Sequence, residues 1–128
     1  MEILIRGVDN SDMDSIIDFN TEYGNGKAVW NGNSDPEVGN KYNVEYDITD
    51  ILEWNKTVSL SKEKSFKIFI EEEITHIIGV LEKVYKDGIS DLRFGNSIIQ
   101  LEVEGKDLPV GEYVLVKADS LEVYDTVY

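Results

Sequence analysis

The segment from Asp47 to Trp54 carries the side chains with the most obvious chemistry in the chain. Its sequence, DITDILEW, places three carboxylates, Asp47, Asp50 and Glu53, next to Trp54. Carboxylates attract a basic partner, and an aromatic ring beside them can provide the buried contact on which tight binding depends. The segment therefore predicts a binding surface for a basic protein.

The same segment supports a second interpretation, in which its apolar side chains are core and its carboxylates simply face water. Trp30 and Trp54 also suggest a different function. If exposed, either indole ring would offer a flat surface on which a sugar ring can stack. A ligand- or oligosaccharide-binding β module is therefore the main alternative to a protein that binds a basic protein.

No residue or motif predicts a catalytic site. His76 is the only histidine and there is no cysteine, so neither a multi-histidine nor a thiolate zinc site can form. A lone histidine between Thr75 and Ile77 on an expected strand is typical of a structural residue. The run 71–73 is three glutamates whose side chains would alternate between strand faces, and 9–14 is typical of a turn. We predict no catalytic residue, metal or cofactor. A hydrolase with two carboxylates is a third hypothesis, with no pair located.

The charge of the chain limits its partners. The 128 residues contain 26 Asp and Glu against 12 Lys and Arg, a net charge of −14, and residues 1–54 alone carry 12 acidic and 3 basic side chains. Contacts to phosphates need clustered basic side chains, so binding to nucleic acid is not expected. The N-terminus lacks the basic region of a signal peptide, and no apolar run approaches a membrane span. We expect a cytoplasmic protein with no membrane partner.

Short strands must position these side chains. The clearest is 41–48, where Tyr42, Val44, Tyr46 and Ile48 alternate with polar residues and share one face. Similar patterns predict further strands, and three turn signals at Asn25-Gly26, Asp87-Gly88 and Gly95-Asn96 predict hairpins. The expected strands are 2–8, 27–30, 66–71, 89–94, 98–103, 113–117 and 121–124.

Two segments match a helical pattern as well as a strand. In 74–85 the apolar residues recur at helical spacing, but the β-branched residues and Gly79 favour a strand. In 11–20 the Ser11 to Asp14 sequence resembles a helix cap, whereas Ile17 and Phe19 alternate as in a strand. We predict strands for both.

Together these patterns predict one domain over 1–128 that is all-β, or β-rich α+β with at most one short helix. Short strands separated by regular turns are typical of a small antiparallel β-barrel or sandwich. The expected core consists of inward-facing strand residues: Tyr42, Val44, Tyr46, Ile68, Ile70, Ile78, Val80, Leu101, Val114 and Val116.

The strand pattern from Lys41 onward, continued by 78–82 and 97–101, resembles small bacterial OB-like β-barrels. The small, acidic, cysteine-free chain is also similar to immunity proteins of bacterial polymorphic and contact-dependent toxin systems. That resemblance implies a protein that binds and blocks a cognate toxin, often a basic nuclease. OB folds usually bind nucleic acid or oligosaccharide through an open strand face, but the net charge departs from the nucleic-acid version.

Overall fold

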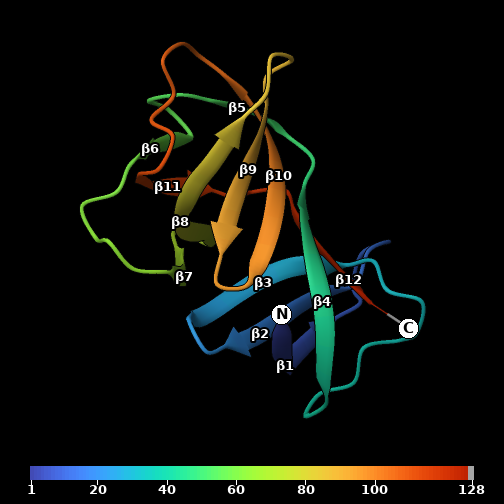
Figure 1. Cartoon of the computed structure of the whole chain (residues 1–128). Coiled ribbons are helices and arrows are strands. Elements are labelled where there is room, and N and C mark those ends of the chain that lie inside the picture. Colours follow the sequence, from blue (N-terminus) through green and yellow to red (C-terminus); the bar gives the residue numbers. More distant parts are fainter. Residues whose placement is uncertain (127–128) are drawn as a thin grey trace.

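The computed structural model describes residues 1–126, which form twelve strands and no helix (Figure 1). The protein is therefore all-β, as predicted, and the described residues contain no helix that could cross a membrane. The strands are β1 (Glu2–Asp9), β2 (Ile16–Thr21), β3 (Gly24–Trp30), β4 (Lys41–Ile48), β5 (Ile51–Glu53), β6 (Val58–Leu60), β7 (Lys67–Glu71), β8 (Ile74–Val84), β9 (Ile89–Phe94), β10 (Ser97–Glu104), β11 (Tyr113–Lys117) and β12 (Leu121–Asp125).

Five strands close into a small barrel. Strands β4, β1, β2 and β3 are joined by antiparallel pairing, β12 pairs antiparallel with β4, and a short parallel pairing between β12 and β3 closes the ring. The predicted small β-barrel is confirmed, with the difference that one of its five pairings, between β12 and β3, is parallel and the barrel is therefore mixed. The last strand of the chain returns to complete a barrel that the first four strands begin, and it enters beside β3 in the parallel direction.

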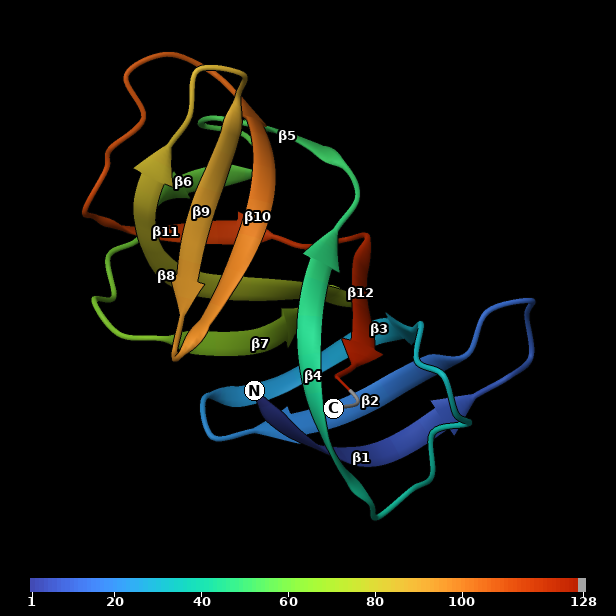
Figure 2. The same ribbon diagram turned by 45° about the vertical axis from the view of Figure 1, so that its right-hand side comes forward.

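The other strands form a curled sheet packed on this barrel (Figure 2). Strands β7, β8, β9 and β10 pair in order as antiparallel neighbours, and β5 adds to β10 in parallel. Strand β11 pairs with β8, and β6 pairs with β11. The two regions join where the Ile68 N–H donates to the Tyr23 carbonyl oxygen at 3.1 Å.

Aromatic rings connect the interiors of the two regions. The ring of Tyr46 in the barrel lies 6.2 Å from Phe19 and 6.0 Å from Phe94 on β9. Phe94 also lies 5.3 Å from Tyr23, and Phe66 approaches it edge-on at 6.4 Å. Because edge-on and tilted ring pairs add to the gain from burial, this cluster fixes the barrel to the second sheet.

Most of the predicted core is confirmed. Val44, Tyr46, Ile68, Ile78, Leu101, Val114 and Val116 are buried. Tyr42 and Val80 are only half-buried. The prediction that Ile70 belongs to the core is wrong, because 41% of its surface is exposed. Ile70 pairs with Thr75, one residue pair before the β7–β8 turn.

The turn predictions have a mixed outcome. The hairpins at Asp87-Gly88 and Gly95-Asn96 are confirmed, and both glycines have the positive φ that such turns require. The Asn25-Gly26 turn is wrong. These residues lie within β3, and the chain turns at 22–23. A Cβ on Gly26 would lie 2.6 Å from Cζ of Phe19. Glycine is therefore needed here because the Phe19 ring packs against it, and not because of a turn.

Both ambiguous segments are strands, as predicted. Gly79, which counted against a helix, is needed where β8 pairs with β9, because a Cβ there would lie 2.4 Å from the Arg93 carbonyl oxygen. Strand β2 starts only at Ile16. The preceding residues form the expected turn, in which the Ser11 N–H donates to Asp9 Oδ1 at 2.9 Å.

Candidate binding surface

The outward side of the β4–β12 ladder carries the candidate surface. Alternate residues of these strands point into the barrel and are buried: Val44, Tyr46 and Ile48 on β4, and Leu121 and Val123 on β12. The residues between them must therefore point outward. The register places Asp47 opposite Glu122 and Glu45 opposite Tyr124. We call Glu45, Asp47 and Glu122 the acidic face.

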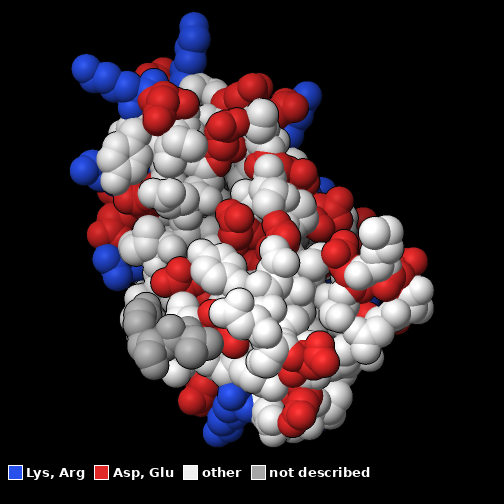
Figure 3. All heavy atoms as spheres, turned by 90° about the vertical axis from the view of Figure 1, so that its right-hand side faces the viewer, with Lys and Arg blue, Asp and Glu red and all other residues white. Residues whose placement is uncertain are grey.

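In the described part of the chain, the acidic face forms no ion pair with Lys or Arg. None of the ion pairs formed by residues 1–126 involves Glu45, Asp47 or Glu122. The side-chain contact of Glu122 is neutral, a hydrogen bond of 2.9 Å from Asn31 Nδ2 to its Oε1. Figure 3 shows the side of the molecule that contains β4, with red carboxylates spread across it and blue side chains at its margin. Like charges directly opposite in an antiparallel pair destabilise the sheet, so these residues do not contribute to folding through charge.

Tyr124 adds an aromatic group to the acidic face. Its side chain is 37% exposed, and burial of the rest raises the pKa of its hydroxyl above the ordinary value. A hydrogen bond with Glu45 and the negative charges of Glu45 and Asp47 raise that pKa further. The hydroxyl therefore remains protonated at neutral pH and can act as a donor, while the exposed part of the ring is available for contact.

The structure brings only two of the five predicted binding residues to this region. Asp47 belongs to the acidic face. Asp50 follows β4, and its N–H donates to Ser120 Oγ at 3.1 Å just before β12 begins, which places Asp50 at the end of the same ladder. Glu53 lies on β5, where its carboxylate forms an ion pair of 3.1 Å with Lys56.

Neither tryptophan offers an open ring. Trp30 is buried, with its ring 4.9 Å from Tyr42 and its Nε1–H donating to the Ser34 carbonyl oxygen at 2.7 Å. Its expected role as an exposed stacking surface is therefore wrong. Trp54 is half-buried and packs tightly on the backbone of Gly105, where a Cβ would lie 2.6 Å from Cβ of Trp54. Trp54 also packs against the hydrophobic core near the end of β10.

Sequence reasoning missed Glu45, Glu122 and Tyr124 as members of the surface. Alternation along 41–48 did place Glu45 and Asp47 on the outward side, so part of the signal was present. The pairing of β4 with β12 was not visible, because nothing local in either strand specifies a partner so distant along the chain. The charge that gathers on this face arises from that pairing.

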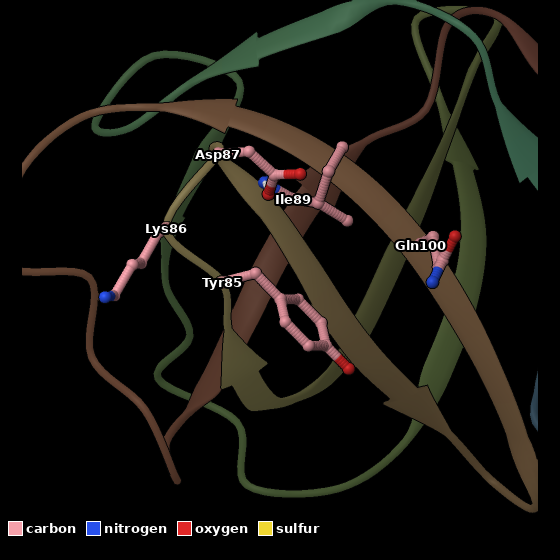
Figure 4. Close-up of a pocket in the computed structure, with 5 residues that line it drawn as sticks. All are labelled: Tyr85, Lys86, Asp87, Ile89 and Gln100. Atoms are coloured by element: carbon pink, nitrogen blue, oxygen red, sulfur yellow. Dashed lines mark hydrogen bonds between the residues drawn. The ribbon is translucent and has the colours of Figure 1, made fainter.

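A shallow depression of about 490 Å³ lies elsewhere, near the β8–β9 hairpin (Figure 4). Tyr85 and Gln100 flank β9, and Lys86 points away from them. The Tyr85 hydroxyl donates to Asp91 Oδ2 at 2.9 Å, and Lys83 Nζ lies 4.9 Å from the centre of the ring. The depression therefore has one aromatic wall and a few polar groups.

The single histidine has structural contacts, as expected. His76 is buried, its ring stacks on Phe69 at 5.0 Å between centres, and its Nδ1 lies 2.9 Å from the Ile74 carbonyl oxygen. No three His, Asp or Glu side chains within residues 1–126 are placed to hold a metal ion. Comparison with protein-family models, curated proteins and solved structures finds no match. The function must therefore be argued from the chemistry of the surface.

Proposed function

We propose that this protein is a non-enzymatic, acidic binding protein that inhibits a basic protein partner, in the manner of an immunity protein that neutralises a toxin inside the cytoplasm. The observation that carries this proposal is the acidic face. Asp47 lies directly opposite Glu122, Glu45 is next to them, and no Lys or Arg compensates them in the described structure. In the folded protein the carboxylates of Asp47 and Glu122 repel each other across the ladder, and a bound cationic partner would offset this repulsion.

Two physical effects follow from such a surface. Long-range attraction would speed encounter with a basic partner, and salt would weaken it because the Debye length is only about 8 Å at physiological ionic strength. The exposed ring of Tyr124 then supplies a contact that can be desolvated, which slows dissociation. The same charge repels phosphates, so the proposed partner is a protein and not nucleic acid.

The test starts from a partner isolated from the native host, or from a toxin encoded beside the gene. With both proteins purified, association and dissociation rates are measured at low and high salt. We expect the Asp47→Lys and Glu122→Lys double variant to associate about tenfold to a hundredfold more slowly at low salt. Tyr124→Ala should mainly speed dissociation. For a toxic partner, co-expression of the wild type should restore growth and the double variant should not.

Glu63→Lys is the matched control. Glu63 is an exposed carboxylate that pairs with Lys67 at 3.3 Å. It belongs to the loop between β6 and β7, which lies across the molecule from β4 and β12 in Figure 1, so its reversal should leave the association rate nearly unchanged. An association rate that does not respond to salt, or that responds equally to all these reversals, would refute a role specific to the acidic face.

The depression beside Tyr85 favours a second candidate, a ligand- or oligosaccharide-binding module. A flat ring with amide and carboxylate groups around it is a common arrangement for binding a polar ring. Tyr85 would then provide the stacking ring, the role that the sequence predicted for Trp30 or Trp54. Titrating the protein with a panel of oligosaccharides, with Tyr85→Ala as the control, tests it. Binding that disappears in Tyr85→Ala would support this candidate.

A further inference from the structure

The β10 strand has a free edge. The two-residue turn at Gly95-Asn96 closes the β9–β10 hairpin with Ser97 opposite Phe94, so alternate residues from Ser97 onward bond to β9. The Val103 N–H accordingly donates to the Gly88 carbonyl oxygen at 3.0 Å. The backbone groups of Ile98 and Gln100 must then point away from β9. Strand β5 pairs with this second edge only from Glu102 to Glu104.

A second strand edge faces the same gap. The Val44 N–H donates to the Met1 carbonyl oxygen at 2.8 Å, and the Met1 ammonium donates to the Val44 carbonyl oxygen at 3.0 Å. In the described structure the pairing of β1 with β4 extends no further along β4 than Val44, so the backbone groups of Tyr46 and Ile48, which point the same way, are not paired with β1. Strands β4 and β10 run side by side in Figures 1 and 2, with β12 on the far side of β4, and no ladder joins β4 to β10 within residues 1–126.

A groove of about 410 Å³ opens where these two edges diverge. Its lining is mostly neutral and polar, with Glu45 as its acidic side chain and Ile98 45% exposed. The lining residues are Met1, Asn43, Val44, Glu45, Tyr46, Asn96, Ser97, Ile98 and Thr126. Buried backbone donors and acceptors are almost always paired, so a groove bordered by free strand edges is suited to bind a backbone.

We propose that the partner docks by adding an extended segment to the free edge of β10 from its Gly95-Asn96 end, where the groove separates β10 from β4. Backbone hydrogen bonds to Ile98 and Gln100 would supply the affinity, as in other cases of strand addition. Glu45 lines this groove, and Asp47 lies two residues further along the same outward side of β4, so alternate residues of the added segment should be Lys or Arg. This inference rests on the proposed function, because it takes the partner to be basic.

The first test uses amide hydrogen exchange of the intact protein and needs no variant. In the free protein, the amides of Ile98 and Gln100 should exchange at least about tenfold faster than those of Ile99 and Leu101, which bond to β9. An end-blocked peptide of alternating Lys and Val, about eight residues long, is the probe, since it spans the edge at about 3.3 Å per residue. Adding it should slow exchange at Ile98 and Gln100 at least about tenfold and leave Ile99 and Leu101 unchanged.

Three results would overturn strand addition. The first is strong protection of Ile98 and Gln100 in the dilute free protein. The second is protection that increases with protein concentration without peptide, because a second copy of the chain would then occupy the edge. The third is equal protection by a peptide in which Glu replaces Lys, which would remove the charge argument.

A backbone variant separates this inference from the proposed function. Gln100→Pro removes only the N–H that points away from β9, whereas Gln100→Ala keeps it. Gln100→Pro should weaken binding of the purified partner about tenfold, the effect of one lost backbone hydrogen bond, and Gln100→Ala should not. If Gln100→Pro binds like the wild type while the acidic-face reversals still weaken binding, strand addition fails and the proposed function remains.

Discussion

The outward faces of β8–β9 and β4–β12 differ in how their charges are paired: a carboxylate on β8–β9 has a cationic partner, and those on β4–β12 have none in the described structure. On β8–β9, Arg93 holds Glu82 with two bonds, Nε to Oε2 at 2.7 Å and Nη2 to Oε1 at 2.9 Å. On β4–β12, Asp47 faces another carboxylate, Glu122, without a cation. Glu82 is the unpaired residue at a register shift in β8, whereas Asp47 and Glu122 lie directly opposite each other in a regular part of the β4–β12 ladder.

The contrast shows which charges serve the fold. The hydrogen bond from Arg93 holds the pKa of Glu82 below its ordinary value, which means that the folded state favours the ionised carboxylate. The acidic face has no such partner, and its charges repel one another across the ladder. An ion pair within the fold therefore accounts for the carboxylate of Glu82. Glu122 has only the neutral hydrogen bond from Asn31, and neither Asp47 nor Glu122 forms an ion pair within residues 1–126.

Both faces should unfold together as one cooperative unit. Truncating the aromatic cluster that they share should have the largest effect on the free energy of unfolding. Phe94→Ala should lower the free energy of unfolding by about 3–5 kcal/mol, because the ring is fully buried between the two regions. Trp30 reports on the barrel and Trp54 on the second sheet. In variants that keep only one tryptophan, both fluorescence transitions in urea should coincide. Two separate transitions would show that the faces unfold independently.

High pH should produce the next largest effect, and it acts through Tyr46 in the shared core. Burial raises the pKa of Tyr46 far above its ordinary value of 10.0. Above about pH 10 the unfolded chain therefore loses this proton while the folded chain retains it, and the free energy of unfolding falls by about 1.4 kcal/mol per pH unit.

Denaturant unfolding between neutral pH and pH 11 measures this loss. Tyr46→Phe should reduce the slope, because it removes only the hydroxyl that contacts the Met1 sulfur at 3.3 Å. Tyr124→Phe, on the exposed acidic face, should change the slope less. An unchanged slope in Tyr46→Phe would mean that this hydroxyl is not held neutral by the fold.

A smaller effect should distinguish the two carboxylates that follow β4. Asp50→Lys should slow association with the basic partner severalfold, because Asp50 continues the acidic face. Glu53→Lys should slow it less, because Lys56 already neutralises Glu53. Stopped-flow measurements at low salt compare the two. Equal slowing would show that net charge alone, and not its position, guides the encounter.

Local patterns in the sequence were enough to predict the strands but not how they meet. The alternation from Lys41 to Ile48 marks β4 with the bounds that the structure has, and the Asp87-Gly88 turn is correctly placed. Strands β5 and β6 were missed because each has three residues, too few to show alternation. The turn expected at Gly26 failed because a tertiary contact, the Phe19 ring, determines that position.

The candidate site was predicted only in part for the same reason. Asp47 and Asp50 were found because they are close in sequence. Glu122 was not, because only the β4–β12 register brings it opposite Asp47. The interpretation of Trp30 failed because sequence alone does not tell a buried strand tryptophan from an exposed one; here its indole N–H finds a carbonyl within the loop that follows.

The free energies of unfolding of Asp47→Asn and Glu82→Gln at low salt test the central contrast most directly. Asp47→Asn removes a repulsion and should stabilise the protein, by about 0.5 kcal/mol. Glu82→Gln removes the partner of Arg93 and should destabilise it. Added salt should shrink both differences, because it screens both interactions. Opposite signs would support the account. If both substitutions destabilise the protein, the carboxylate of Asp47 stabilises the fold. That result would contradict the proposal that the acidic face is a binding surface.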